Sequence, residues 1–155
     1  MFIDIAYLLN TGLPISEEIS NEKLNRAIFT AENYIIKPRL GEFYNLITEN
    51  PTEYSVELSG GVLTDDDDKR VYVAGLQLAE AHLAYAYLLT DFVNVTTFGA
   101  VLKNDDYSSH ADADRLRNAG MMHVEIGLQY LREITDFYHI KNDRKQLPDF
   151  WEELI

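Results

Sequence analysis

The sequence predicts a mainly α-helical protein, a bundle of three to five helices around a buried central helix with one or two short β-hairpins or extended arms. Three observations support this fold class. Residues 71–92 are apolar on nearly every side of a helical wheel, which is typical of a buried helix. Apolar residues recur at helical spacing in 24–35 and in 113–138, whereas 54–63 and 93–103 have the residue types of extended chain.

Length and charge limit the functions to consider. A chain of 155 residues is long enough for one core, and we assign 1–140 to a helical domain and 141–155 to a C-terminal tail. The net charge of -13 disfavours a protein that grips nucleic acid through phosphates. The absence of cysteine excludes disulfide scaffolds and thiolate zinc sites. Asp4 interrupts the first apolar residues, so we expect no cleaved signal peptide and a soluble protein made in a cytoplasm.

The N-terminal third contains the first predicted helices. The apolar residues 2–9 indicate one helical turn or a strand, because the turn-forming residues 10–14 follow them. Ser20 or Asn21 is expected to cap the helix whose apolar stripe runs over 24–35. Pro38 then predicts a break or kink at Lys37, followed by a second helical piece over 40–47 that Asn50-Pro51 ends.

The next segment changes to a period of two residues. Tyr54, Val56 and Leu58 alternate with polar residues, so we predict a small hairpin or extended arm over 54–63, with its turn at Ser59-Gly60-Gly61. The four aspartates 65–68 follow and are expected to lie in water. Four consecutive carboxylates cannot converge on one cation without the spacing of a calcium loop, which disfavours a metal site there.

The central helix is the segment that most needs partners. Gln77, Glu80, His82 and Asp91 interrupt its apolar surface, which favours a buried core helix over a membrane span. A core helix that is apolar on several sides requires neighbours on several sides. We therefore expect a chain this short to leave part of the helix to be covered by other subunits.

The C-terminal half contains one further arm, one long helix and a tail. Residues 93–103 are rich in β-branched residues and predict a second hairpin or an extended loop. Helical spacing then continues over 113–138, with Ser108 or Ser109 as the expected cap. After a charged linker, the chain carries an apolar cluster that we expect to dock on the body or on a partner: Phe150, Trp151, Leu154 and Ile155.

The sequence contains little that indicates catalysis. None of the histidines stands in a metalloprotease or nucleophile-elbow pattern, and the glycines at 60–61 lack the lysine of a phosphate-binding loop. His110, Asp112 and Asp114 come closest to a set of metal ligands. Acidic residues at a helix N-terminus have a simpler explanation in the helix dipole. We therefore predict that the protein is not an enzyme and that it has no cofactor and no metal site.

Several short motifs resemble one family when they are taken in order. They are Tyr34-Ile35-Ile36-Lys37-Pro38-Arg39-Leu40-Gly41, Leu58-Ser59-Gly60-Gly61, Val73-Ala74-Gly75-Leu76, Val95-Thr96-Thr97-Phe98-Gly99-Ala100-Val101, and Lys103 with Asp106-Tyr107-Ser108. Together they look like a family of small proteins of tailed bacteriophages, especially phages of Bacteroidales bacteria including the crAss-like group, that are head-tail connector or ring proteins. The resemblance covers roughly residues 4–138, and the tail after Ile140 lies outside it.

The resemblance implies a structural subunit of the virion at the head-tail junction, synthesised in the host bacterial cytoplasm. It implies a head-completion adaptor that forms a homo-oligomeric ring, often dodecameric, beneath the portal protein. Other head-tail and tail connector proteins are further expected partners, DNA passes through the channel without sequence-specific binding, and no membrane is involved. An acidic channel wall suits this role because it repels phosphates.

Ring formation uses heterologous contacts, in which one face of a subunit buries a different face of the next. Such contacts would supply the missing cover for the central helix, with 54–63 and 93–103 as the arms. The residues that we expect at subunit or partner contacts are Phe98, Val101, Leu102, Tyr107, Phe150 and Trp151. Two alternatives remain open: a small helical metal-binding or enzymatic domain that uses His110, Asp112 and Asp114, and a host-directed phage regulatory protein.

Overall fold

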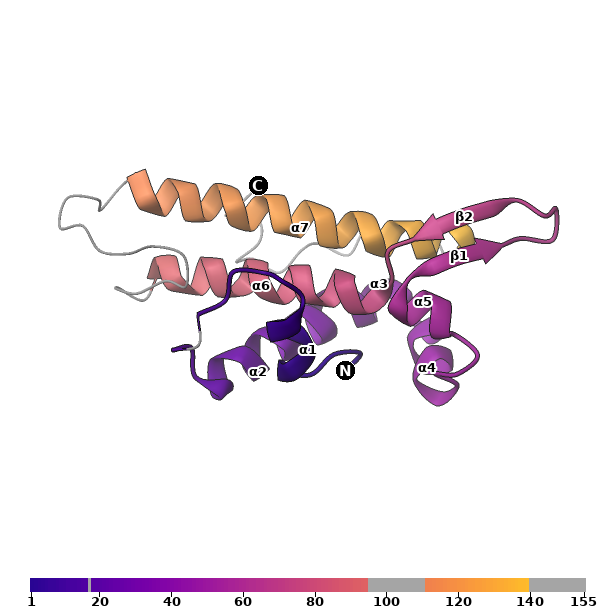
Figure 1. The fold of residues 1–155 in the computed structure, drawn as a ribbon, viewed down its shortest axis with the longest axis horizontal. Coiled ribbons are helices and arrows are strands. Elements are labelled where there is room, and N and C mark those ends of the chain that lie inside the picture. The colour runs from indigo at the N-terminus through magenta and orange to yellow at the C-terminus, as the bar shows by residue number, and fades with distance from the viewer. Residues whose placement is uncertain (17, 95–110, 140–155) are drawn as a thin grey trace.

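The fold, seen in a computed structural model that describes residues 1–16, 18–94 and 111–139, is mainly α-helical with one antiparallel hairpin, as the sequence predicts (Figure 1). Its elements, in chain order, are α1 (Ile5–Asn10), α2 (Asn21–Thr30), the π-helix η1 (Ala31–Ile36), α3 (Lys37–Leu40), α4 (Glu42–Glu49), α5 (Ser55–Ser59), β1 (Gly61–Thr64), β2 (Arg70–Val73), α6 (Leu76–Asn94) and α7 (Ala111–Phe137).

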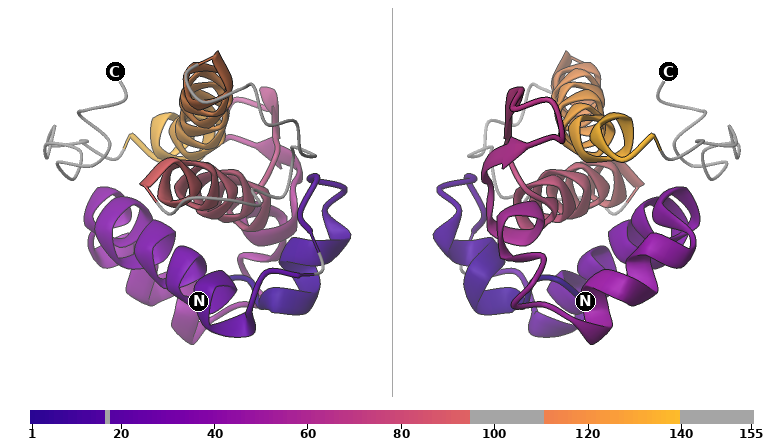
Figure 2. Two further views of the ribbon diagram at one scale, coloured as in Figure 1. Left: turned by 90° about the vertical axis from the view of Figure 1, so that its left-hand side faces the viewer. Right: turned by 90° about the vertical axis from the view of Figure 1, so that its right-hand side faces the viewer.

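Helix α6 is the middle layer of the molecule. The long helix α7 runs antiparallel along one side of it, and the N-terminal helices α1, α2 and η1 curve around the other side (Figures 1 and 2). Its side chains at Leu76, Leu83, Leu88 and Leu89 are almost completely buried. The prediction of a buried central helix is confirmed, although the helix begins at Leu76 and residues 71–73 of the predicted segment belong to β2.

The cover of this helix comes from its own chain. Helices α7, α2, η1 and α5 all pack against α6, and they bury it on several sides. The expectation that neighbouring subunits must cover the central helix is therefore wrong for the part of α6 whose side chains the structure describes. Helix α7 covers one side of α6 and the curved N-terminal layer covers the other, whereas a single flat layer would leave half of α6 exposed.

The N-terminal helices follow the predicted start but differ at the predicted break. Ser20 caps α2, and its side chain accepts a hydrogen bond from the Lys23 amide, as expected. Pro38 does not end the helix, because the π-helical turn η1 widens the helix just before the proline ring. The break falls instead at Gly41, whose positive φ of 57° redirects the chain into α4.

The hairpin lies later in the chain than predicted. Residues 55–59 form the short helix α5, and the glycines at 60–61 lead into β1 and do not form the turn. The strands β1 and β2 pair with each other, and the acidic run 65–68 forms most of the loop between them. Three alternating apolar residues in 54–58 were too few to specify a strand, since the same residues also fit one helical turn.

Several predicted segments lie outside the described residues. These are most of the second arm at 93–103, the caps Ser108 and Ser109, and the tail 141–155. Val93 and Asn94 belong to the last turn of α6, and α7 occupies the predicted long helix. The described part of the chain contains no helix long and apolar enough to span a membrane.

Two glycines of α7 provide a test of how closely α6 and α7 pack. A Cβ at Gly127 would lie 2.7 Å from Leu83 Cγ and 3.0 Å from the Ala79 carbonyl oxygen, whereas a Cβ at Gly120 would have ordinary contacts from 3.5 Å. We expect Gly127→Ala to destabilise the protein by about 1–3 kcal/mol through overpacking. Gly120→Ala, the matched control, should be neutral or stabilising by up to about 1 kcal/mol because alanine favours helix. Urea denaturation checks both, and equal effects would contradict the close packing at Gly127.

Candidate interaction surface

The contact residues expected from the sequence lie outside the described part of the chain: Phe98, Val101, Leu102, Tyr107, Phe150 and Trp151. Their roles stay predictions. His110 is also outside it, and Asp112 and Asp114 lie in the first turns of α7. Among the residues that the structure describes, no group of three or more His, Asp or Glu side chains is placed to hold a metal ion.

The β1–β2 hairpin forms an arm, residues 61–73, that projects from one end of the body (Figure 1). Val62 and Tyr72 are direct cross-strand partners, and their side chains are 53% and 72% exposed. On the opposite face, Leu63 and Val73 are buried against the body. The arm thus has the alternation of a half-buried hairpin, except that its outer face carries a large apolar pair. This neighbouring pair of exposed apolar side chains makes the outer face of the arm a candidate contact surface.

The tip of the arm is acidic and locally ordered. The carboxylate of Asp65 accepts hydrogen bonds from the amides of Asp67 and Lys69, at 3.0 and 2.8 Å. Asp66, Asp67 and Asp68 are exposed. The first aspartate therefore closes the loop in the manner of an Asx turn, while the other three present their charges to solvent.

The base of the arm is fixed to the body. Gly60 and Gly75 approach each other so closely that a Cβ at Gly75 would lie 2.4 Å from the Gly60 nitrogen. The Ala74 amide also donates a 3.1 Å hydrogen bond to a carboxylate oxygen of Glu133 on α7. A contact surface held this firmly loses little conformational entropy when a partner binds.

A second exposed surface lies on the N-terminal helices. Phe29 on α2 and Tyr34 on η1 have side chains that are 53% and 57% exposed. The exposed residues Arg26 and Lys37 lie one turn before Phe29 and about one turn after Tyr34. We call these four residues the cationic face. Two cationic residues near two exposed aromatic residues contrast with the acidic balance of the whole chain, although the Lys37 ammonium itself lies over the Tyr44 ring.

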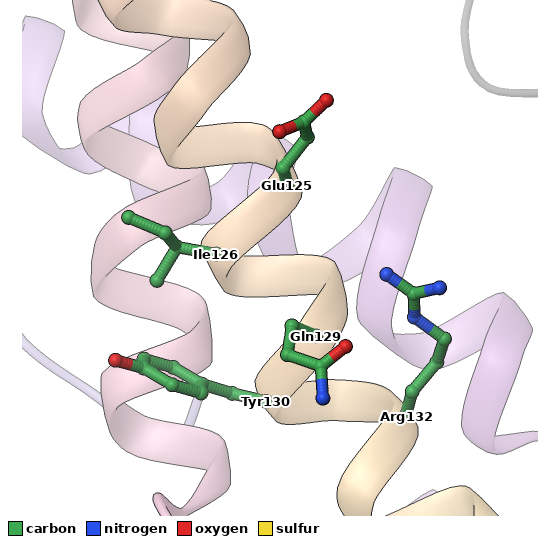
Figure 3. A pocket seen from close by; sticks show the side chains of 5 residues that line it. All are labelled: Glu125, Ile126, Gln129, Tyr130 and Arg132. Atoms are coloured by element: carbon green, nitrogen blue, oxygen red, sulfur yellow. The ribbon is translucent and has the colours of Figure 1, made fainter.

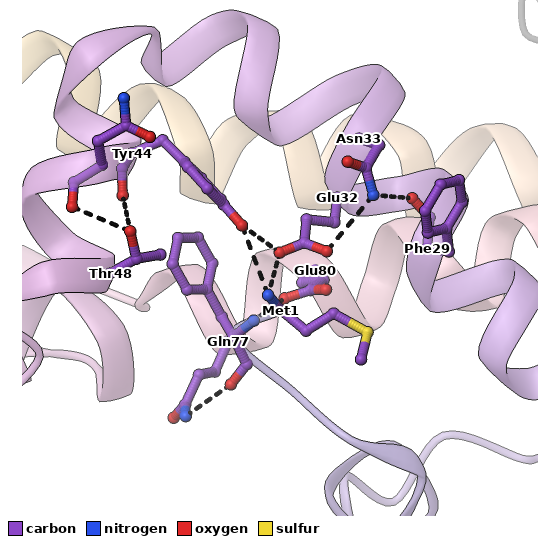
Figure 4. Close-up of polar contacts among 10 residues, drawn as sticks. Met1, Phe29, Glu32, Asn33, Tyr44, Thr48, Gln77 and Glu80 are labelled. Carbon is purple, nitrogen blue, oxygen red and sulfur yellow. Dashed lines mark hydrogen bonds and ion pairs between the residues drawn. The ribbon is translucent and has the colours of Figure 1, made fainter.

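Buried carboxylates form a polar cluster between the N-terminal segment and α6 (Figure 4). Glu32 forms an ion pair with the α-amino group of Met1 and accepts a hydrogen bond from the Tyr44 hydroxyl. Glu80 accepts a 3.0 Å hydrogen bond from the Phe2 amide. Because Glu80 is fully buried and the N-terminal residues cover it, we interpret the cluster as a structural attachment of that segment.

Two shifted pKa values follow from this environment. Burial, reinforced by the nearby charge of Glu32, raises the pKa of Glu80 to about 8. Burial and the hydrogen bond to Glu32 also raise the pKa of Tyr44. The second carboxylate oxygen of Glu80 has no hydrogen-bond partner in the described residues, which agrees with a side chain that is neutral near pH 7.

A histidine pair joins α6 to α7 and was not predicted. The Nδ1 atoms of His82 and His123 are 2.8 Å apart, and Tyr85 and Tyr130 pack edge-on against the two rings. Burial and the second histidine lower the pKa of His82 to about 4, and burial lowers the pKa of His123. Both rings are therefore neutral at pH 7, and one donates a hydrogen bond to the other. Their positions 41 residues apart gave no local signal in the sequence.

An open depression of about 440 Å³ lies along α7, where Ile126 and Tyr130 reach toward α6 and Glu125, Gln129 and Arg132 point away from it (Figure 3). All of its lining residues belong to that one helix: Glu125, Ile126, Gln129, Tyr130 and Arg132. A ligand pocket normally surrounds most of its ligand with several elements. A depression lined by one helix is a weak candidate for a ligand site, so the arm is the stronger candidate for a functional surface.

Comparison with known proteins gives one family match. The model of a family described as a family of unknown function, DUF6712, matches residues 36–142. The matched region includes the arm, α6 and α7. Comparison with curated proteins and comparison with solved structures give no match.

Proposed function

The chain belongs to the DUF6712 family, and from the surfaces described above we propose that it is a structural subunit that assembles into a homo-oligomeric ring. The proposed ring is the head-tail connector of a tailed bacteriophage, an adaptor beneath the portal protein through which DNA passes. The protein then resides in the virion at the head-tail junction and acts without catalysis.

The exposed arm is the observation that carries this proposal. Tyr72, the most exposed large apolar side chain among the described residues, stands beside Val62 on a hairpin that is fixed at its base. A monomer gains nothing from such a pair in water, because burying an aromatic side chain releases about 2 kcal/mol or more. A subunit that pairs with neighbours recovers this free energy on assembly.

Two further observations support the role. The order of the short motifs resembles that of phage connector proteins, and two of these motifs, at 58–61 and 73–76, meet in the structure where α5, the arm and α6 join. The net charge of -13 also suits a channel wall, since a negative surface repels DNA phosphates and lets the duplex pass.

The test is a mass-spectrometric inventory of intact phage particles with the stoichiometry of this protein relative to the portal protein. We expect the wild-type protein at a fixed ratio and a Tyr72→Asp variant that folds but is absent from particles, because a charge cannot be buried at the contact. Met122→Asp is the control, since Met122 is 51% exposed on α7, away from the arm.

Folding of each variant is checked by circular dichroism and thermal unfolding before particles are analysed. If the Tyr72→Asp variant is incorporated into particles at the wild-type ratio, the arm is not part of the contact between subunits. Absence of the wild-type protein from particles, together with a stable complex with a host protein, would replace the connector role by the host-directed alternative.

A further inference from the structure

We infer that the arm of one copy docks on the cationic face of the next copy, the surface formed by Arg26, Phe29, Tyr34 and Lys37. This inference rests on the proposed function, because it names the contact by which the ring closes. It goes beyond that function by assigning both halves of the interface to described residues of the chain.

The first argument is apolar complementarity. The outer face of the arm presents Val62 and Tyr72, and the cationic face presents Phe29 and Tyr34, all at least half exposed. Each pair is large enough to form the centre of a contact but too small to bind strongly alone. A contact between the two pairs removes four exposed apolar side chains of the described residues, three of them aromatic, from water at once.

The second argument is charge. The arm tip carries four aspartates in 65–68, followed by Lys69 and Arg70, so its net charge is negative. Along the chain, Arg26 precedes Phe29 and Lys37 follows Tyr34, with Glu22 one turn further toward the N-terminus of α2. The Lys37 ammonium lies 5.2 Å from the centre of the Tyr44 ring, so its charge sits over that ring at the end of the face. On a chain with a net charge of -13, most other surfaces repel an acidic loop. The cationic face attracts it and thereby fixes the direction of approach.

The third argument is geometry. The arm projects from one end of the long axis of the molecule, while α2, which carries Arg26 and Phe29, lies toward the other half of the body (Figure 1). The α3 helix, which begins at Lys37, lies nearer the base of the arm. Because the arm points away from the body, its tip reaches this face on another copy. A contact between two different surfaces is heterologous, so it repeats from copy to copy and yields a ring when the rotation closes. The opposite arrangement, arm against arm, gives only a dimer.

Cross-linking tests the contact directly, because the wild-type chain has no cysteine. One chain carries Thr64→Cys, on the exposed face of the arm, and a second chain of different mass carries Asn25→Cys, beside Arg26 and one turn before Phe29. The control replaces the second chain by Asn45→Cys, an exposed position on α4. With a short bismaleimide reagent, we expect the arm to cross-link to position 25 roughly tenfold more than to position 45.

Charge reversal adds a second readout. Asp66→Lys with Asp67→Lys on the arm, or Arg26→Glu with Lys37→Glu on the cationic face, should each reduce the selective cross-link to the level of the control. Mixing the two charge-reversed chains should restore it, because opposite charges then face each other again. Restoration cannot come from misfolding of either variant.

Equal cross-linking to positions 25 and 45 would overturn the inference, and so would dominant linkage between two arms. The proposed function is judged separately by the inventory of particles. If the protein occupies particles but its arm shows no preference for position 25 there, the docking contact fails and the connector role stands. If the selective cross-link forms but the protein is absent from particles, the contact stands and the connector role fails.

Discussion

Gly75→Ala is expected to destabilise the fold by about 3 kcal/mol or more, which is the largest effect of a single methyl group that we expect in this protein. Gly75 has a φ of 96°, and a Cβ there would lie 2.4 Å from the Gly60 nitrogen and 2.8 Å from the Leu58 carbonyl oxygen. These are backbone atoms, so they cannot move aside by a rotamer change. The junction between arm and body must open, and urea denaturation measures the loss.

Gly12→Ala is the matched control for this experiment. Gly12 also has a positive φ, 79°, but a Cβ there has no atom within 4 Å. Its replacement therefore reports the backbone strain alone, about 1 kcal/mol. If Gly75→Ala costs no more than Gly12→Ala, the close approach of the two chain segments does not contribute to stability.

Glu80→Gln is expected to make the protein more stable above pH 6.5 and to remove a downward slope of stability with pH. The pKa of Glu80 is raised from 4.5 to about 8 in the folded protein, so the folded state holds a proton that the unfolded state has lost between these pH values. The free energy of unfolding of the wild type then falls by about 1.4 kcal/mol for each pH unit in that window. Glutamine keeps the acceptor for the Phe2 amide and does not titrate.

The measurement is the free energy of unfolding of both proteins at several pH values between 6.5 and 8. Below pH 6.5 the lowered pKa of His82 makes the free energy of unfolding fall as the pH falls, because His82 binds a proton in the unfolded state but stays neutral in the folded state. The gap between variant and wild type should grow by about 2 kcal/mol from pH 6.5 to pH 8. Glu125→Gln, at an exposed position, is the control. A gap that is constant with pH would show that Glu80 is already charged when folded.

The sequence predicted the helical framework because helices carry local signals. Ser20 as a cap, the stripe in α2 and the long spacing of α7 all depend on residues within a few turns of each other, and all three elements are present. Pro38 was misleading because its usual effect is to break a helix, and a π-helical turn instead accommodates it. The actual break needs the positive φ at Gly41, which sequence position alone does not reveal.

The sequence predicts a hairpin arm, but over 54–63, whereas the hairpin in the structure spans residues 61–73. The apolar run through Val71 and Val73 predicts the start of the central helix there, whereas both residues belong to the strand that pairs with β1. The signal was present in the alternation of Val71, Tyr72 and Val73 after a polar loop. The polar cluster and the histidine pair depend on residues 78 and 41 positions apart, so only the folded chain brings them together.

The attachment of Phe2 to Glu80 has a consequence for how the protein folds during synthesis. A ribosome releases the N-terminal helices well before α6 is complete, so those helices emerge without the rod that they enclose. Their apolar faces remain in water until the middle of the chain arrives. The N-terminal helices should therefore pack only when α6 and α7 have been synthesised. Folding is then slower than for a protein with mostly local contacts, because these contacts join residues far apart in the sequence.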